Sequence, residues 1–218
     1  WSSDVCSSDL VTASLGGVAL TQSATVNFVS GTPVKYLISA TPSAPVAGTP
    51  LSVNAQLMDA NDAPVATAGR VVTWSRSPTS GTFAAATSTT DGSGIASVSF
   101  TSDPVIATYV FTGTDNGALA GSNTIGVRTV AGVGVRYTVG TTVAQLVSGG
   151  TAPFTAQLRD ANGNAAPGIG LGKSVTWSAT AGGGTFSAAT SPVDSAGTAR
   201  GDRKSTRLNS SHTDISRM

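Results

Sequence analysis

The chain has 218 residues, a formal net charge of +1, and only 11% charged against 39% hydrophobic residues. It contains no Glu, one His and one Cys, so the commonest general acids and bases and soft metal ligands are nearly absent. The charges form no basic patch, and no apolar run approaches the ~18 residues of a membrane span. We therefore expect no catalytic, cofactor-binding or metal-binding residues, no cofactor, no nucleic-acid partner, no membrane insertion and no enzymatic activity.

Both ends of the chain are predicted to be foreign to the protein. One permitted codon string for residues 1–10 has a reverse complement that, in a shifted frame, encodes the residues of 202–210 in order. The string resembles a ligation adapter of short-read sequencing libraries. We therefore interpret residues 1–10 and 202–218 as translated adapter and exclude them from functional reasoning.

Residues 11–32 are expected to hold the last strand or strands of a preceding immunoglobulin-like domain. The stretch Ser23–Ser30, "SATVNFVS", resembles Ser122–Thr129, "SNTIGVRT". The second stretch is the final strand that we predict for the domain that follows.

A complete domain is predicted over residues 33–130. Runs of small and β-branched residues alternate there with Gly, Pro, Asn and Asp, a pattern typical of a sandwich of short strands. Seven strands are predicted, at Lys35–Ala40, Leu51–Met58, Arg70–Arg76, Gly81–Ala86, Ile95–Thr101, Ala107–Gly113 and Asn123–Thr129.

Alternation within these strands assigns the core of the domain. The inward side chains should be those of Leu51, Val53, Ala55, Leu57, Val72, Trp74, Ala96, Val98, Phe100, Tyr109 and Phe111. A ligand-stacking role is conceivable for Trp74 and its repeat counterpart Trp177. We favour a core role, because a Trp that ends an alternating apolar strand usually packs between two sheets.

Residues 131–201 repeat the first part of the complete domain. "AQLMDAN", "VTWS" and "GTFAAATS" return as "AQLRDAN", "VTWS" and "GTFSAATS" roughly 100 residues later, the length of one immunoglobulin-like domain. The second copy stops where the fifth strand of the first copy would start, so we expect a truncated domain, unstable alone and with exposed strand edges. The fold class is therefore all-β, with tandem immunoglobulin-like β-sandwiches of about seven strands per complete domain.

Four acidic motifs are interpreted as turns. Asp160–Asn164, "DANGN", matches the opening of an oxygen-ligand calcium loop and Asp59–Ala63 matches it partly, but no Glu closes either loop. We favour turns in which Asp bonds its own backbone, and leave calcium binding at Asp160–Asn164 as the alternative. Asp91–Gly94 and Asp194–Gly197 are likewise expected to be turns before a strand.

Two further motifs are assigned no chemistry. The Ser and Thr residues of 11–201 have no His to activate them, and Lys35 and Lys173, the candidates for Ser–Lys chemistry, lie where strands begin. The tripeptide Arg200–Asp202 is the sequence that integrin ligands display on a loop. Here it aligns with the fifth strand of the complete domain, so we expect it inside a strand.

The repeated stretches resemble the bacterial immunoglobulin-like repeats of the invasin and intimin type, the Big-1-like domains. The resemblance is carried by "TPSAPVAGTPLSVNAQLMDANDAPVA", "VVTWS", "GTFAAATSTTDGSGIASVSFTS" and "ATYVFTGT". It implies tandem domains of a bacterial surface or secreted protein that hold another module away from the cell envelope. No terminal receptor-binding module is matched, so adhesion itself is not implied.

These observations favour a non-enzymatic structural spacer or stalk in an adhesin-like protein that is secreted or anchored at the outer membrane. Its expected partners are the neighbouring immunoglobulin-like domains of the same chain, with a host or surface receptor reached through another domain. The alternative is a glycan- or receptor-binding module, or an accessory region of a secreted enzyme or phage tail protein. Such a binder should expose an aromatic or charged cluster.

Overall fold

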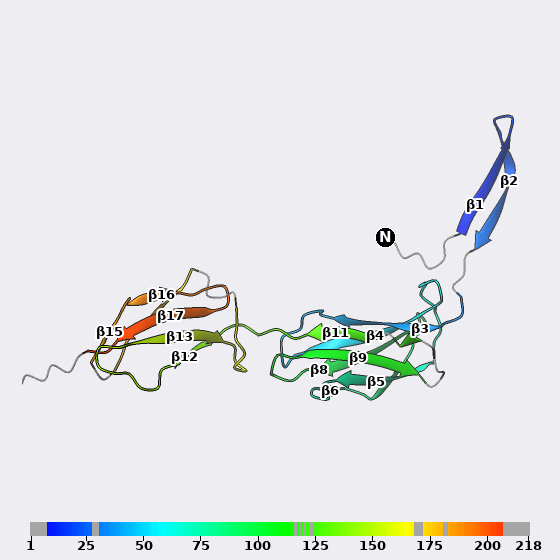
Figure 1. Ribbon diagram of the computed structural model, residues 1–218. Coiled ribbons are helices and arrows are strands. Elements are labelled where there is room, and N and C mark those ends of the chain that lie inside the picture. Colours follow the sequence, from blue (N-terminus) through cyan, green and yellow to red (C-terminus); the bar gives the residue numbers. More distant parts are fainter. Residues whose placement is uncertain are drawn as a thin grey trace, which may run out of the picture. The chain divides into compact units, whose positions relative to one another are not determined.

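The computed structural model describes residues 8–27, 31–115, 117, 119, 121–122, 124–167, 172–180 and 183–206. All regular structure in these residues is β-strand, which confirms the all-β prediction (Figure 1). The strands are β1 (Ser8–Leu15), β2 (Val18–Asn27), β3 (Lys35–Thr41), β4 (Pro50–Met58), β5 (Val71–Ser77), β6 (Thr82–Phe83), β7 (Thr87–Thr89), β8 (Ile95–Thr101), β9 (Thr108–Asp115), β10 (Gly121–Ser122), β11 (Thr124–Arg128), β12 (Arg136–Thr141), β13 (Thr151–Arg159), β14 (Ser174–Thr176), β15 (Thr185–Phe186), β16 (Thr190–Pro192) and β17 (Thr198–Lys204). The chain divides into two compact units, residues 1–130 and 131–218.

The first unit begins with an antiparallel hairpin of β1 and β2. Gly16 and Gly17 form its two-residue turn with φ of 62° and 80°, and positive φ at both positions is what a type I′ hairpin turn requires. No other described strand pairs with the hairpin. β2 contains the start of the strand predicted at Ser23–Ser30, and residues 28–30 lie outside the described residues. β1 begins before residue 10, so the predicted end of the adapter segment does not coincide with an end of a strand.

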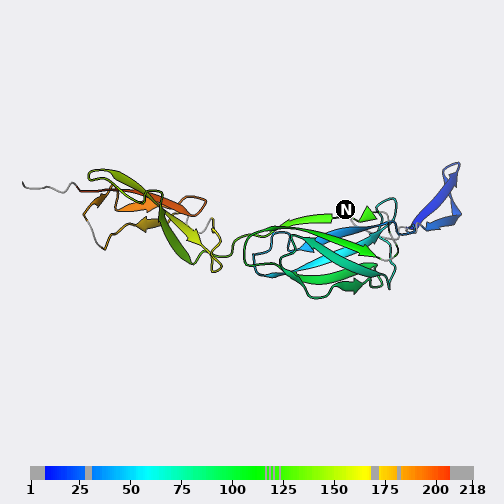
Figure 2. The ribbon, with the colours of Figure 1, turned by 60° about the horizontal axis from the view of Figure 1, so that its bottom comes forward.

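Residues 31–130 form a complete two-sheet sandwich (Figure 2). One sheet has the strand order β10-β3-β4-β8-β6, and the other has the order β11-β9-β5-β7. Neighbouring strands are antiparallel except that β10 runs parallel to β3. The orders β3-β4-β8-β6 and β5-β9-β11 match the ABED and CFG sheets of a constant-type immunoglobulin sandwich, so the predicted fold class is confirmed.

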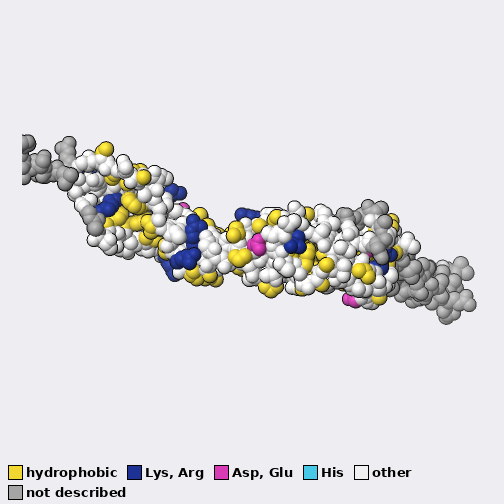
Figure 3. Space-filling view, turned by 90° about the horizontal axis from the view of Figure 1, so that it is seen from below, with side chains coloured by type: hydrophobic (Ala, Val, Ile, Leu, Met, Phe, Trp, Pro, Cys, Tyr) yellow, Lys and Arg dark blue, Asp and Glu magenta, His cyan; other side chains and the backbone are white. Residues whose placement is uncertain are grey.

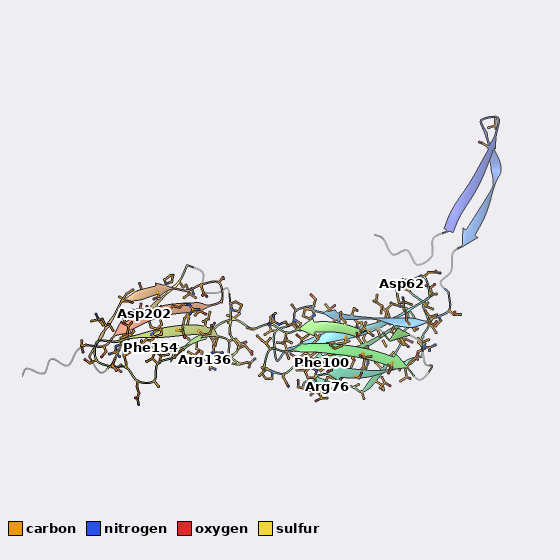
Figure 4. All side chains as sticks on the ribbon, in the orientation of Figure 1. Asp62, Arg76, Phe100, Arg136, Phe154 and Asp202 are labelled. Atoms are coloured by element: carbon orange, nitrogen blue, oxygen red, sulfur yellow. The ribbon has the colours of Figure 1, made fainter. Side chains whose placement is uncertain are left out.

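The predicted core of this domain is confirmed as well, since every inward residue assigned by alternation is buried. The centre is aromatic: the ring centroid of Phe100 lies 4.8 Å from that of Phe111 and 5.0 Å from those of Phe83 and Tyr109. Figure 4 labels Phe100 within the complete domain. Edge-to-face rings of this kind add to the stability that burial of their area provides.

One predicted strand is wrong. Instead of a single strand over Gly81–Ala86, the chain forms β6, which pairs with β8, and then β7, which pairs with β5 in the opposite sheet. The chain changes sheets within the run of small residues Ala84–Ala86. Such a run has no alternation of large and polar side chains, so the sequence pattern did not reveal the crossing.

The second unit repeats part of this pairing. β12-β13-β17-β15 form one sheet in the order of β3-β4-β8-β6, and β14 pairs with β16 as β5 pairs with β7. Its small core contains Ala156, Trp177, Val193 and Ala199, with Phe154, Val175 and Phe186 packed against it. The described residues of this unit include no counterpart of β9 or β11. β17 continues to Lys204 opposite Thr151, so the strand crosses the boundary predicted at Gly201.

Candidate functional site

The carboxylate of Asp59 joins a turn to the segment that precedes β3, the first strand of the complete domain. Its Oδ1 accepts hydrogen bonds from the backbone N–H groups of Asn61 and Ala63, both at 2.9 Å. Its Oδ2 accepts one from the N–H of Gly31 at 2.8 Å. The first two bonds build the predicted Asx turn, and the third fixes the chain just before the first strand of the domain.

Asp160 does the same in the second unit. Its Oδ1 accepts from the N–H groups of Asn162 at 3.0 Å and Asn164 at 2.8 Å. Its Oδ2 accepts from the N–H of Gly132 at 2.9 Å and from the side-chain amide of Asn164 at 3.0 Å. In both units the glycine lies 28 residues before the aspartate. We call each aspartate–glycine contact a linker clamp.

Both clamp carboxylates are buried and held in the ionised form. The N–H of Gly31 and then that of Ala63 hold the pKa of Asp59 below its usual value. Burial acts to raise the pKa of Asp160, but the donors on Asn164, Gly132 and Asn162 outweigh it and the pKa is lowered. Hydrogen bonds to a carboxylate favour its charged form in this way.

These contacts bear on the calcium alternative at Asp160–Asn164. A bound calcium ion requires carboxylate and carbonyl oxygens that face it, whereas both oxygens of Asp160 face N–H donors. Across the described part of the chain, no group of three or more His, Cys, Asp or Glu side chains could hold a metal ion. The geometry agrees with the turn interpretation.

A second polar cluster joins the two sheets of the complete domain. The hydroxyl of Tyr36 on β3 donates to Oδ2 of Asp115 on β9 at 2.9 Å, and Nε of Arg70 donates to the same oxygen at 2.6 Å. Burial, and then the bond to Asp115, raises the pKa of Tyr36 to about 12. Burial also acts to raise the pKa of Asp115, but Arg70 and Tyr36 outweigh it and lower the pKa. No sequence motif marks this cluster, because its three residues come from separate segments of the chain.

The remaining predicted turns form as expected. Oδ1 of Asp91 accepts from the N–H groups of Ser93 at 2.8 Å and Ile95 at 3.0 Å. Asp194 accepts from the two equivalent N–H groups at 2.9 Å and 2.8 Å. Both carboxylates bond within their own turns and not to a described linker residue, so these two turns differ from the linker clamps.

The two tryptophans lie in the cores. The indole N–H of Trp74 donates to Oγ of Ser88 at 2.9 Å, and that of Trp177 donates to Oγ of Ser191 at 2.8 Å. Both indoles are buried, so the predicted core role is confirmed. A ligand-stacking Trp would present a ring face to solvent instead.

The lysines considered for Ser–Lys chemistry serve other contacts. Lys35 forms an ion pair with Asp62. Lys173 precedes β14 and lines a shallow cavity with Tyr137 and Leu158. The structure therefore brings neither lysine into a described nucleophile–base pair.

The tripeptide Arg200–Asp202 lies inside β17, as predicted (Figure 4). Gly201 pairs with Phe154 of β13, and the carbonyl of Asp202 accepts a hydrogen bond from the N–H of Ser187 at 2.8 Å. A strand that is paired on both sides does not present these residues as a loop does.

Arg203 occupies a position that is a core position in the repeat. It aligns with Phe100, and its guanidinium lies 5.8 Å from the ring centroid of Phe186, much as Phe100 lies over the equivalent Phe83. A cation thus stands where the complete domain has an aromatic ring.

Two cavities of the second unit are lined by described residues that include no pair of acid and base groups. One, of about 590 Å³, is lined by Ser148, Gly149, Thr185, Lys204, Ser205 and Thr206. Another, of about 240 Å³, is lined by Val143, Ala144, Leu146, Ala152, Phe154, Gly183, Arg203 and Ser205. Hydrophobic side chains are visible at the surface of this unit (Figure 3).

No helix in the described part of the chain is long and apolar enough to cross a membrane.

No protein-family model and no curated protein matches the chain. Among solved structures, it is similar to the FdeC adhesin of Escherichia coli, with a TM-score of 0.48 and 19% identity over 93% of this chain and 66% of that one. It is also similar to the D0-D1 domain of intimin, with a TM-score of 0.40 and 19% identity over 78% and 84% of the two chains. A glycoside hydrolase family 2 member from Bacteroides cellulosilyticus has a TM-score of 0.42 and 18% identity over 55% and 17%. The chain thus spans less than two thirds of the FdeC and hydrolase structures, and none of their activities is carried over to it.

Proposed function

We propose that the chain is a segment of a non-enzymatic structural spacer, a stalk of tandem Big-1-like domains in a secreted or surface-anchored bacterial adhesin-like protein. The linker clamp is the observation that carries this proposal. A buried carboxylate holds the backbone just before the first strand in both units, at the same spacing of 28 residues. A spacer depends on how its domains are joined, and a clamp repeated at each junction restricts that joint.

The polar groups of the complete domain support the same function, because many of them are engaged internally. Arg76 donates to the carbonyl oxygens of Thr79, Ser80 and Gly81, and its guanidinium lies over the ring of Phe83. The cluster around Asp115 is equally internal. Side chains used in this way stabilise a sandwich and are not free to recognise a ligand.

The proposed partners are the neighbouring domains of the same chain, with any receptor contacted through another domain. A glycan- or receptor-binding role for these domains is the competing function. Part of the hydrophobic surface of the second unit does not favour that role, because the exposed Tyr137 and Val139 occupy the positions of Tyr36 and Ile38, which are buried core in the complete domain.

The clamp is tested by measuring the distribution of distances between the two units. Spin labels placed at Val105 and Val147, both well exposed, in a Cys6→Ser background report on the junction by pulsed electron resonance. Asp160→Asn keeps Oδ1 for the turn but turns an amide donor toward the N–H of Gly132. We expect the distance distribution to broaden in this variant.

Asp194→Asn is the matched control, since Asp194 builds a turn without a linker contact. Its distribution should equal that of the unmodified chain. An unmodified chain that is already as broad as Asp160→Asn would overturn the clamp as the basis of a spacer. Saturable binding of the full chain to glycans or host cells, lost on replacing exposed residues of 33–130, would establish the competing function.

A further inference from the structure

The first and last strands of the complete domain run alongside each other in the same direction. Gly121 of β10 pairs with Lys35 of β3 in parallel, and Val130 forms a parallel bridge with Val46. The chain therefore follows one course twice, first through β3 and the segment after it, and last through β10 and β11. It enters the domain at one end of that course and leaves the domain at the other end (Figure 1).

Tension on the domain acts along this shared course. A pull on the residues before β3 draws β3 toward the end where the chain enters, and a pull on the residues after Val130 draws β10 and β11 in the opposite direction. The two strands are therefore loaded in shear. Because the hydrogen bonds between them lie across the pull, these bonds share the force and must break together. Forced unfolding is governed by the barrier to unfolding, and simultaneous breakage raises that barrier.

One contact that resists this sliding lies where the chain leaves the domain. The N–H of Ala47 donates to the carbonyl oxygen of Val130, and the N–H of Val130 donates to the carbonyl oxygen of Pro45, both at 2.9 Å. Pro45 and Ala47 belong to the segment between β3 and β4. Both bonds therefore join the course of the first strand to that of the last strand.

A second contact lies near the start of β3. The hydroxyl of Tyr36 donates to Oδ2 of Asp115 on β9, and Nε of Arg70 donates to the same oxygen. Tyr36 is buried, so a displaced hydroxyl would lose this bond without gaining one from water. Since β3 and β9 belong to different sheets, sliding of β3 against the second sheet must break the bond.

A third contact lies before β3. The N–H of Gly31 donates to Oδ2 of Asp59 at 2.8 Å, and the N–H of Val34 donates to the carbonyl oxygen of Met58 at 2.9 Å. Met58 ends β4, which pairs with β3 on one side and with β8 on the other. A pull that enters at Gly31 therefore acts on a central strand of the sheet as well as on β3.

We infer that the complete domain resists tension applied through its two ends, and that the three contacts along the course of β3 carry this resistance. The inference rests on the proposed function, because a stalk transmits any force between the surface that anchors it and the module that it presents. It adds a mechanical role to that of a spacer, which requires only length. Spin-label distances test the joint and force measurements test the domain, so each proposal can fail alone.

Optical tweezers on the full chain test the resistance. In a Cys6→Ser background, handles at Val18→Cys and Val133→Cys pull the domain through its two ends, and both positions are well exposed. The second unit lies outside this tether. Handles at Val105→Cys and Val133→Cys instead peel β11 from β9, beginning at the pair of Thr108 and Arg128.

We expect the unfolding force between the two ends to exceed the peeling force by more than about twofold, because peeled bonds break one at a time. The same folded domain is pulled in both geometries, so its free energy of unfolding is common to both. The ratio of the two forces therefore reports the direction of the pull and not the stability of the domain.

Two tyrosine variants test which contacts resist the pull. Tyr36→Phe removes the hydroxyl that joins β3 to Asp115, so it should lower the ratio of the two forces. Tyr109→Phe is the matched control, because Tyr109 is also buried and its hydroxyl accepts the N–H of Asp103 at 3.0 Å, away from β3. It should not lower the ratio, even where it lowers the stability of the domain.

Val130→Pro tests the contact at the other end of the course. It removes the N–H that donates to Pro45 and keeps the carbonyl oxygen that accepts from Ala47, so it should also lower the ratio. Tyr36→Phe keeps the test decisive if Val130→Pro does not fold. Equal forces in the two geometries, or a ratio unchanged by Tyr36→Phe and Val130→Pro, would overturn the mechanical role and leave the linker clamp and the spacer untouched.

Discussion

Aspartate has two different roles in the turns of this protein. Asp91 and Asp194 bond only to backbone groups of their own turns, whereas Asp59 and Asp160 use the second carboxylate oxygen to hold a linker glycine. The difference lies in what faces Oδ2. An exposed turn aspartate contributes local order, but a buried one whose two oxygens are both bonded couples its turn to a distant segment.

Acid should therefore weaken the complete domain. The pKa values of Asp59 and Asp115 are lowered in the folded state, so the stability they contribute is present above the unfolded value of 3.8 and is lost as the pH falls through the folded values. Urea unfolding should give a constant free energy of unfolding from neutral pH down to about 5 and a decline below about 4. Asp59→Asn should show a shallower decline, and an equal decline in both chains would contradict the role of Asp59.

Sequence reasoning placed the turns, the core residues and both tryptophans correctly but missed the linker clamps. Turns and cores leave a local pattern of side chains, such as "DAN" or an alternating apolar run. The donor in a clamp is the backbone N–H of Gly31 or Gly132, which no side chain marks. The repeated spacing of 28 residues between glycine and aspartate was the available signal, and it became meaningful only when the contact was seen.

At the level of elements, backbone pairing persists in β17 although its inward side chains have changed. Ala199, Gly201 and Arg203 stand where β8 has Ala96, Val98 and Phe100, yet β17 still pairs with β13 and β15. The side chain that Val98 supplies is missing at Gly201, whose backbone lies against the indole of Trp177. Pairing can thus form a strand whose packing is poor.

Arg203→Phe should stabilise the second unit. The substitution restores the ring that lies over Phe83 in the complete domain, and burial of a Phe side chain is worth about 1.5–3 kcal/mol. Thermal unfolding of the full chain should show the transition of the second unit at higher temperature. Lys204→Phe, one residue further on the exposed side of β17, is the matched control and should not raise it.

An unchanged or lower transition for Arg203→Phe would mean that position 203 does not behave as a core position. Strand boundaries elsewhere followed the alternation of side chains closely, as in β4 and β8. The predicted strand was wrong between β6 and β7, where a run of small residues leads the chain from one sheet to the other.

At the scale of the molecule, the two units differ in completeness. Residues 31–130 enclose an aromatic core between two sheets, and a sandwich of this size can fold independently. The second unit has the same strand order but fewer described strands on one side of its core. We therefore expect the full chain to unfold in two steps, the second unit first.

Residues 31–130 expressed alone should keep the later transition at an unchanged temperature, because their described core contacts lie within the segment. Calcium and chelator should leave both transitions of the full chain unchanged, since the oxygens of Asp160 are engaged by N–H donors. Differential scanning calorimetry measures both effects. A calcium-dependent rise of the earlier transition, abolished by Asp160→Asn, would make Asp160–Asn164 a cation site. A segment 31–130 that fails to unfold cooperatively would show that the complete sandwich depends on its neighbours.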